Sequence, residues 1–159
     1  MPIKLASPIK KEFHLSKSDK ELGTDDGATM VIIRQATQGG HELRNDLFSE
    51  FKREYDGATI KVVQRISFDD IRRREVFLTM CSCNVVGENG KPLFKFVNET
   101  LTNESDFQAS WSKLPPVIAQ EIHEKVLEMN PLWNENGVVP EVENEDEAVI
   151  SGEDSSGKD

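Results

Sequence analysis

Two cysteines separated by one serine are the first residues whose types suggest chemistry. The thiols of Cys81 and Cys83 could contribute two ligands to a zinc site. Zinc takes four ligands, usually in pairs two to four residues apart, and the only imidazoles are scattered singly at His14, His41 and His123. Thiols two positions apart in regular structure also bridge each other poorly. We therefore predict small, reduced core thiols and no metal site.

The segment Glu121-Ile-His123-Glu124 has the composition of a metalloprotease helix. That chemistry requires a second histidine four residues after the first, and the position holds Leu127. The spacing instead predicts a half-exposed histidine at the border of an apolar helix face. A metal-dependent enzyme stays an alternative, and its carboxylate ligands would be Asp69, Asp70 and Glu75, or Glu121 and Glu124.

Three consecutive arginines, Arg72 to Arg74, suggest a phosphate clamp. Successive helical residues point about 100° apart, so the three side chains spread around the helix and do not form one patch. We expect local ion pairs with Asp69, Asp70 and Glu75. Contact with an acidic partner, or with the chain's own acidic tail, is the alternative.

The glycine pairs do not have the spacing of a nucleotide-binding loop. Gly39-Gly40, and Gly87 with Gly90, lack both the lysine and serine of a P-loop and the dinucleotide fingerprint. We interpret them as turns. The sequence therefore predicts no catalytic, cofactor-binding or metal-binding residue.

Large apolar side chains near the carboxyl end are the residues most typical of a protein interface. Tryptophan is enriched among the side chains that dominate binding energy. The candidate partner-binding residues are Trp111, Leu114, Ile118, Ile122 and Trp133. The alternative is that they seal the module's own small core. Both interpretations can hold for different faces of the helices.

Besides a short strand near Phe13, two further runs of residues predict strands. Residues 29–36 are β-branched and apolar at their centre, as in a strand covered on both faces. Residues 58–66 alternate in the way of a half-buried strand. Their order allows a right-handed parallel crossover, and antiparallel pairing stays open. Residues 85–96 predict a hairpin, because Asn89-Gly90 supplies the positive φ angles of a tight turn.

Helical periodicity predicts amphipathic helices that pack against the strands. One covers residues 41–55, and a second begins after the N-cap Ser67. A third begins near Ser105 and breaks at Pro115-Pro116, where a fourth begins that ends at Asn130-Pro131. The solvent-facing residues expected in the fourth helix are Glu121, Glu124, Lys125 and Glu128, with Glu121 and Lys125 as an i,i+4 pair.

The charge gathers at the end of the chain. Residues 140–159 hold eight acids and one lysine, which is net −7 of the chain's −10. We predict an N-terminal arm at 1–27, a single α+β domain at 28–133 and a disordered acidic tail at 134–159. The domain would combine a small mixed sheet and hairpins with three to four amphipathic helices, its C-terminal part being helical.

Composition also limits the partners and the compartment. Residues 1–139 keep a net charge of −3 and no basic face, which disfavours a nucleic-acid partner. No run approaches the roughly 18 apolar residues of a membrane span. No secretory segment is present near the polar start, so we expect a soluble cytoplasmic protein.

Three stretches resemble the small tail assembly chaperones of long-tailed, siphovirus-type phages. They are IRQATQGG at Ile33–Gly40, the hairpin Gly90–Phe94, and the block from Trp111 through LPP, EIH and NP to Trp133. The resemblance covers roughly residues 30–135 and includes the acidic tail that follows. In that family the short form commonly ends near a ribosomal slippage site, and Gly157-Lys158 can be encoded by a slippery heptamer.

The resemblance implies a non-enzymatic function in phage tail assembly. Such a protein would bind the tape measure protein and recruit tail tube subunits in the bacterial host cytoplasm, without nucleotide or metal, and would be absent from the mature virion. Self-association is a further expected interaction. The alternative is a structural virion component, such as a neck or head-tail connector protein.

Overall fold

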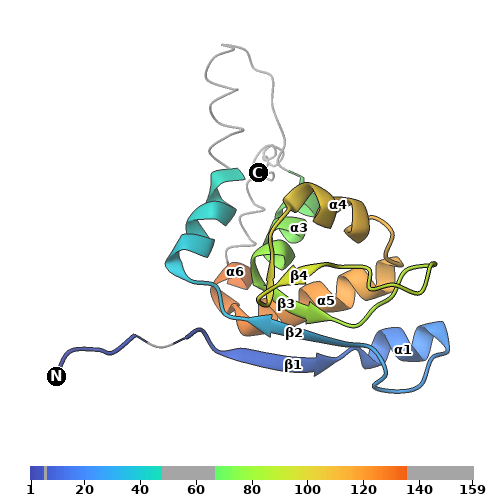
Figure 1. Ribbon diagram of the computed structural model, residues 1–159. Coiled ribbons are helices and arrows are strands. Elements are labelled where there is room, and N and C mark those ends of the chain that lie inside the picture. Colours follow the sequence, from blue (N-terminus) through green and yellow to red (C-terminus); the bar gives the residue numbers. More distant parts are fainter. Residues whose placement is uncertain (6, 48–66, 136–159) are drawn as a thin grey trace, which may run out of the picture.

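The computed structural model describes residues 1–5, 7–47 and 67–135 of the chain. Their fold is α+β, as the sequence predicts (Figure 1). Both described sheets are antiparallel, whereas the sequence predicts a small mixed sheet. The predicted strand at 58–66 lies outside the described residues, as do residues 48–55 of the predicted helix and 136–159 of the acidic tail.

Three antiparallel strands form the larger sheet in the order β1-β2-β3. The strands are β1 (Lys10–His14), β2 (Met30–Arg34) and β3 (Met80–Cys83), and a bulge interrupts the β2–β3 register at Ile32/Ile33. The strands predicted near Phe13 and within 29–36 are thus confirmed. Burial alternates along β2, because Val31 and Ile33 are buried whereas their neighbours are only partly covered. The predicted cover on both faces is therefore full on one face of β2 and only partial on the other.

The second sheet pairs β4 (Phe96–Val97) with β5 (Thr100–Leu101). Its turn residues Asn98 and Glu99 both have positive φ angles, 52° and 62°. These are the dihedral signs of the tight hairpin turn that the sequence analysis expects at Asn89-Gly90.

The predicted turn at Asn89-Gly90 is present, but it has another geometry. Of the two residues only Gly90 has a positive φ, of 78°. The amide of Gly90 donates to the Gly87 carbonyl at 2.9 Å, and the amide of Gly87 donates to the Lys91 carbonyl at 2.8 Å. This is the pattern of a three-residue hairpin loop closed by a left-handed glycine.

Local signals set the ends of the helices. The Ser67 hydroxyl accepts from the amides of Asp69 and Asp70 and begins α3 (Phe68–Thr79), as predicted. The Asn103 side chain begins α4 (Glu104–Trp111), and Pro116 is the first residue of α5 (Pro116–Met129). Asn130 ends α5 before the short α6 (Pro131–Glu135), also as predicted.

Gly39 and Gly40 lie in the first turn of a helix that covers residues 38–47, so their interpretation as a turn is wrong. Thr37 explains the difference, because it provides the N-terminal cap. Its hydroxyl accepts from the Gly40 amide at 3.2 Å and its carbonyl accepts from the His41 amide at 3.0 Å. A good cap offsets the low helix propensity of the glycines.

Much of the predicted N-terminal arm belongs to the folded body. β1 pairs along its whole length with β2, and α1 (Ser16–Leu22) packs against α5. Phe13 and Leu15 are buried in the main core. Among the described residues, 1–5 and 7–8 extend away from the body as an arm (Figure 1).

Glu121 joins α1 to α5 and corrects a second prediction. The residue is buried rather than solvent-facing, and its carboxylate accepts from the amide and hydroxyl of Ser18, both at 2.8 Å, and from the Lys17 amide at 3.3 Å. Instead of Glu121, Lys125 has Glu128 at 3.8 Å as its ion-pair partner. α5 therefore caps the N-terminus of α1.

The core lies between α5 and the three-stranded sheet and continues beneath α4. Aromatic rings tilted against one another extend it there, with the Phe107 centroid 5.5 Å from Phe77 and 5.6 Å from both Phe94 and Trp111. Among the core side chains with less than about a tenth of their surface exposed are Val31, Ile33, Val76, Met80, Ile122 and Val126.

Candidate functional site

The five candidate partner-binding residues come together in and around the protein's own core. Ile122 and Trp133 are 0% and 1% exposed, Ile118 is 6% and Leu114 is 8% exposed, and Trp111 is partly buried. The expectation that they offer an exposed surface is therefore corrected for the first four. Their burial agrees with the alternative, in which they seal the core.

Trp133 links the end of the described chain to the helix at 38–47. Its indole Nε1 donates to Nδ1 of His41 at 2.8 Å. The Arg44 guanidinium carbon lies 5.5 Å from the centroid of the same indole, within cation–π range. A buried tryptophan needs a partner for its N–H group, and His41 provides it.

A largely buried polar cluster of Arg44, Glu75 and His123 lies beside this tryptophan. Nε of Arg44 is 2.5 Å from one Glu75 carboxylate oxygen, and Nε2 of His123 is 2.6 Å from the other. The side chains of Arg44 and Glu75 are each 3% exposed. Three polar groups from three helices thus hold one another inside the fold, as buried charges require.

The cluster is not indicated by the sequence patterns above, in which Glu75 pairs with the arginine run and His123 packs at the border of an apolar helix face. A signal was present, because Ile71, Glu75 and Thr79 recur every fourth residue and all three are buried on one face of α3. A carboxylate in the middle of a buried stripe requires a cationic or hydrogen-bonding partner.

A cleft of about 90 Å3 borders the cluster, between α3, α5 and α6. Phe68 lies at this cleft with 46% of its surface exposed, although helical periodicity predicts it on one apolar face with Ile71 and Leu78. None of the lining residues is a serine, threonine or cysteine that could act as a nucleophile. The lining residues are Arg44, Phe68, Ile71, Arg72, Glu75, His123, Leu127, Trp133 and Asn134.

The arginine run forms separate ion pairs and no common anion site. Arg72 is 3.7 Å from Asp69 and Arg73 is 2.6 Å from Asp70, which confirms the local pairing predicted for these two. Arg74 reaches a different helix, where its Nε lies 2.7 Å from the carboxylate of Glu104 on α4.

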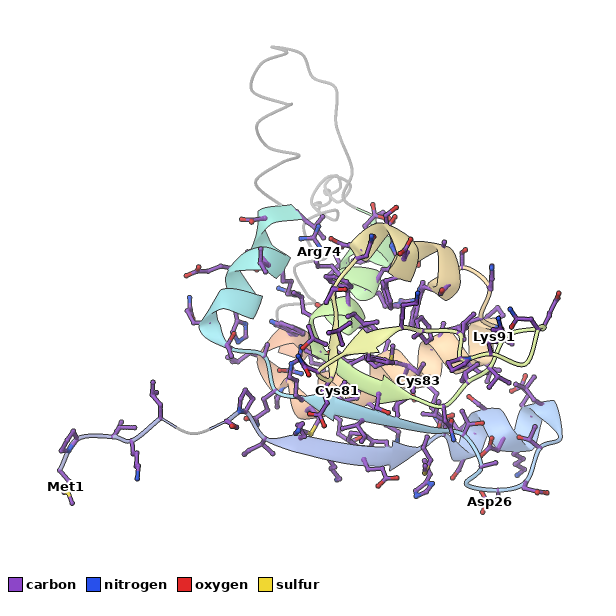
Figure 2. The ribbon with its side chains drawn as sticks, in the orientation of Figure 1. Met1, Asp26, Arg74, Cys81, Cys83 and Lys91 are labelled. Atoms are coloured by element: carbon purple, nitrogen blue, oxygen red, sulfur yellow. The ribbon has the colours of Figure 1, made fainter. Side chains whose placement is uncertain are left out.

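The two cysteines are buried and unbridged, as predicted for core thiols (Figure 2). Burial raises the pKa of the Cys83 thiol to about 11. Nη1 of Arg34 lies 3.1 Å from the sulfur of Cys81 and also donates to the Glu99 carbonyl at 2.9 Å. The Cys83 thiol, with this high pKa, is a poor nucleophile at neutral pH.

Large apolar side chains are exposed elsewhere. Four precede β1: Met1 is fully exposed, Ile3 and Leu5 are each 92% exposed and Ile9 is 62% exposed. Single exposed apolar residues of this kind are ordinary on a soluble protein, whereas a group on one extended segment suggests a contact surface. Those on the folded body are Leu22, Leu43, Phe68, Val86, Val97 and Leu132.

No protein-family model, curated protein or solved structure matches the chain. In the described ranges, no helix has both the length and the apolar character needed to cross a bilayer. The same residues contain no group of three or more histidine, cysteine or acidic side chains placed to hold a metal ion.

Proposed function

We propose that this protein is a non-enzymatic tail assembly chaperone of a long-tailed phage. It binds the tape measure protein in the host cytoplasm, recruits tail tube subunits and leaves before the virion is complete. The resemblance in sequence suggests the partners. The observation that supports a binding function is the cleft beside Phe68, which combines an exposed aromatic ring with a rim of polar groups.

The mechanism is temporary burial of apolar surface. A cleft of about 90 Å3 suits a single apolar side chain, such as a helical partner presents at intervals of three and four residues. Burial contributes about 25 cal/mol per Å2 of apolar area, so a small patch gives a reversible complex. Arg72 and Asn134 at the rim would supply the polar contacts.

The binding site in this proposal differs from the one that the sequence analysis favours. Ile118, Ile122 and Trp133 hold the helices that form the cleft, and the contact itself falls to Phe68 and Leu127. Substitution of the buried residues would then weaken binding through loss of folding. A test must therefore use an exposed residue.

The test is co-purification of the full chain with fragments of the tape measure protein. We expect Phe68→Ser to reduce the retained fragment at least about fivefold, as for an interface anchor. The matched control is Val97→Ser, because Val97 is 53% exposed, belongs to β4 and is not among the residues that line the cleft. Equal retention by wild type and Phe68→Ser would contradict the proposal.

Mass spectrometry of purified virions separates the chaperone from its alternative. A chaperone is expected in infected cells and missing from finished particles. Detection at a fixed stoichiometry in the particle would favour a neck or head-tail connector protein instead. A rise in melting temperature with a divalent metal would favour the enzyme hypothesis.

A further inference from the structure

The N-terminal arm carries an alternating apolar pattern without a surface to cover it. Ile3 and Leu5 flank Lys4, and each apolar side chain is 92% exposed. This is the period of a strand with one apolar face. Pro2 and Pro8 lie on either side of the pattern, and proline cannot continue a hydrogen-bonded ladder.

β1 is the edge strand of the sheet, and its outer side is unpaired among the described residues. Pairing with β2 extends beyond the strand, because the Gln35 amide donates to the Ile9 carbonyl and the Leu15 amide donates to the Thr29 carbonyl. Bonding alternates along an antiparallel pair. The amides of Lys10, Glu12 and His14 therefore point away from β2, toward the open edge.

The usual protection of such an edge is weak here. Edge strands commonly carry lysines that keep other strands away. Nζ of Lys10 is instead bound to Glu99, and Nζ of Lys11 lies 5.1 Å from the centroid of the Phe13 ring. Both lysines are held within their own molecule, and Glu12 is left as a charge complementary to Lys4 of an approaching arm.

The arm is poorly placed to use the edge of its own molecule. It continues directly from β1, and the Ile9 carbonyl is still engaged by β2. A return of residues 3–5 along β1 would have to reverse within residues 6–9, where Pro8 has no amide to donate and the Ile9 carbonyl is already bonded to Gln35. Figure 1 shows the arm leading away from the sheet.

From these observations we propose that Ile3, Lys4 and Leu5 of one copy add as a strand to the β1 edge of a second copy of this chain. The backbone supplies the hydrogen bonds of strand addition, and Ile3 and Leu5 supply the apolar contact. The proposal names a self-association surface that is separate from the cleft at Phe68.

Sedimentation velocity of the full chain tests this inference. Wild type should reach at least twice the 17.9 kDa of one chain as its concentration rises. Ile3→Asp combined with Leu5→Asp should weaken association at least about tenfold, as expected for interface anchors. The control pair Leu22→Asp and Val97→Asp alters exposed apolar positions on the body, 47% and 53% exposed, and should leave association unchanged.

A second variant tests the edge itself. Glu12→Pro removes an amide that points outward, so the β1–β2 ladder keeps its bonds and the melting temperature should stay close to that of wild type. The same variant should sediment as a monomer. Mixed with the arm variant, it should form a one-to-one heterodimer, because one partner retains an intact arm and the other an intact edge.

Monomeric wild type at every concentration would overturn the proposal, and so would association that is unaffected by the arm variant. If the arm binds only another protein, the wild type will stay monomeric at every concentration, and the proposal is overturned. Phe68→Ser should self-associate normally. A failure of tape measure binding is therefore distinguishable from a failure of strand addition.

Discussion

At the scale of single residues, the structure depends on polar groups that satisfy distant backbone amides. Glu121 of α5 serves Ser18 and Lys17 of α1, and Asn130 at the end of α5 accepts from the Ala36 amide at 2.8 Å after β2. Both side chains are more than nine-tenths buried. Removal of such a group leaves a buried donor without an acceptor, which costs more than the bond itself contributes.

Glu121→Ala should therefore lower the free energy of unfolding by about 1–3 kcal/mol, because the amide of Ser18 loses its acceptor. Urea denaturation measures the change. Glu124→Ala is the matched control: Glu124 sits one turn along the same helix, its side chain is 42% exposed, and it pairs only with the exposed Lys17 side chain. An equal loss in the two variants would show that capping of α1 contributes nothing.

Asp19 gives stability a dependence on pH. Burial acts to raise the pKa of its carboxyl, but hydrogen bonds from Thr29 and Thr24 outweigh burial and hold the pKa below the ordinary 3.8. The charged form is thus favoured in the folded state. Its contribution is complete above the ordinary pKa and is lost as the pH falls through the lower folded value.

Asp19→Asn should accordingly destabilise the protein at neutral pH and by a smaller amount at pH values below 3.8. Urea midpoints of both proteins, measured across this range, give the difference. Asp25→Asn is the control, because Asp25 is an exposed acid in the loop after the same helix. A difference that does not change with pH would argue against a charged Asp19 as the stabilising group.

At the scale of elements, helix ends are determined by nearby residues. Ser67→Ala should cost about 1 kcal/mol, because two amides of the first turn of α3 lose their acceptor. Ser67→Asp should retain most of the stability, since an acid caps and also favours the positive helix end. Thermal unfolding ranks the three proteins. A Ser67→Asp variant as unstable as Ser67→Ala would contradict the capping argument.

This locality explains which elements can be predicted from sequence. Caps and breakers at Ser67, Pro116 and Asn130 act within a few residues, and the helices there begin or end as expected. The strand runs near Phe13 and Val31 also follow from local pattern. The fold class was predictable for the same reason.

Turn geometry that depends on residues far away in the sequence was not predictable in the same way. Asn89-Gly90 has the stronger local preference for a two-residue turn, yet Asn98 and Glu99 adopt it. Tertiary contacts favour that outcome, because Lys10 binds the Glu99 carboxylate and Arg34 binds the Glu99 carbonyl. Lys10 is 89 positions from Glu99 in the sequence.

In the candidate site, too, local patterns were predictable from sequence, whereas contacts between distant residues were not. Trp133 and Ile122 were recognisable as important apolar residues, but sequence periodicity does not distinguish a buried face from one that awaits a partner. The Arg44–Glu75–His123 cluster joins residues 31 and 48 positions apart. Only the packed helices show that they meet.

At the scale of the whole molecule, the charge is divided unevenly along the chain. Residues 136–159 hold the same eight acids and one lysine, net −7, so their removal changes the net charge from −10 to −3. We expect the truncated protein to unfold at nearly the same temperature but to be less soluble at neutral pH, because charge repulsion between molecules falls. Light scattering and calorimetry measure the two effects. A large drop in melting temperature would mean that the tail stabilises the fold.

The contact between Glu121 and the start of α1 also bears on how the protein is made. Ser18 is translated about one hundred residues before its acceptor, since 103 positions separate the two. Until α5 has left the ribosome, the first helix has no cap and Phe13 and Leu15 have no complete core to enter. The fold should therefore close late in translation, and a nascent chain that stops short of α5 should remain open to proteases and chaperones of the cell.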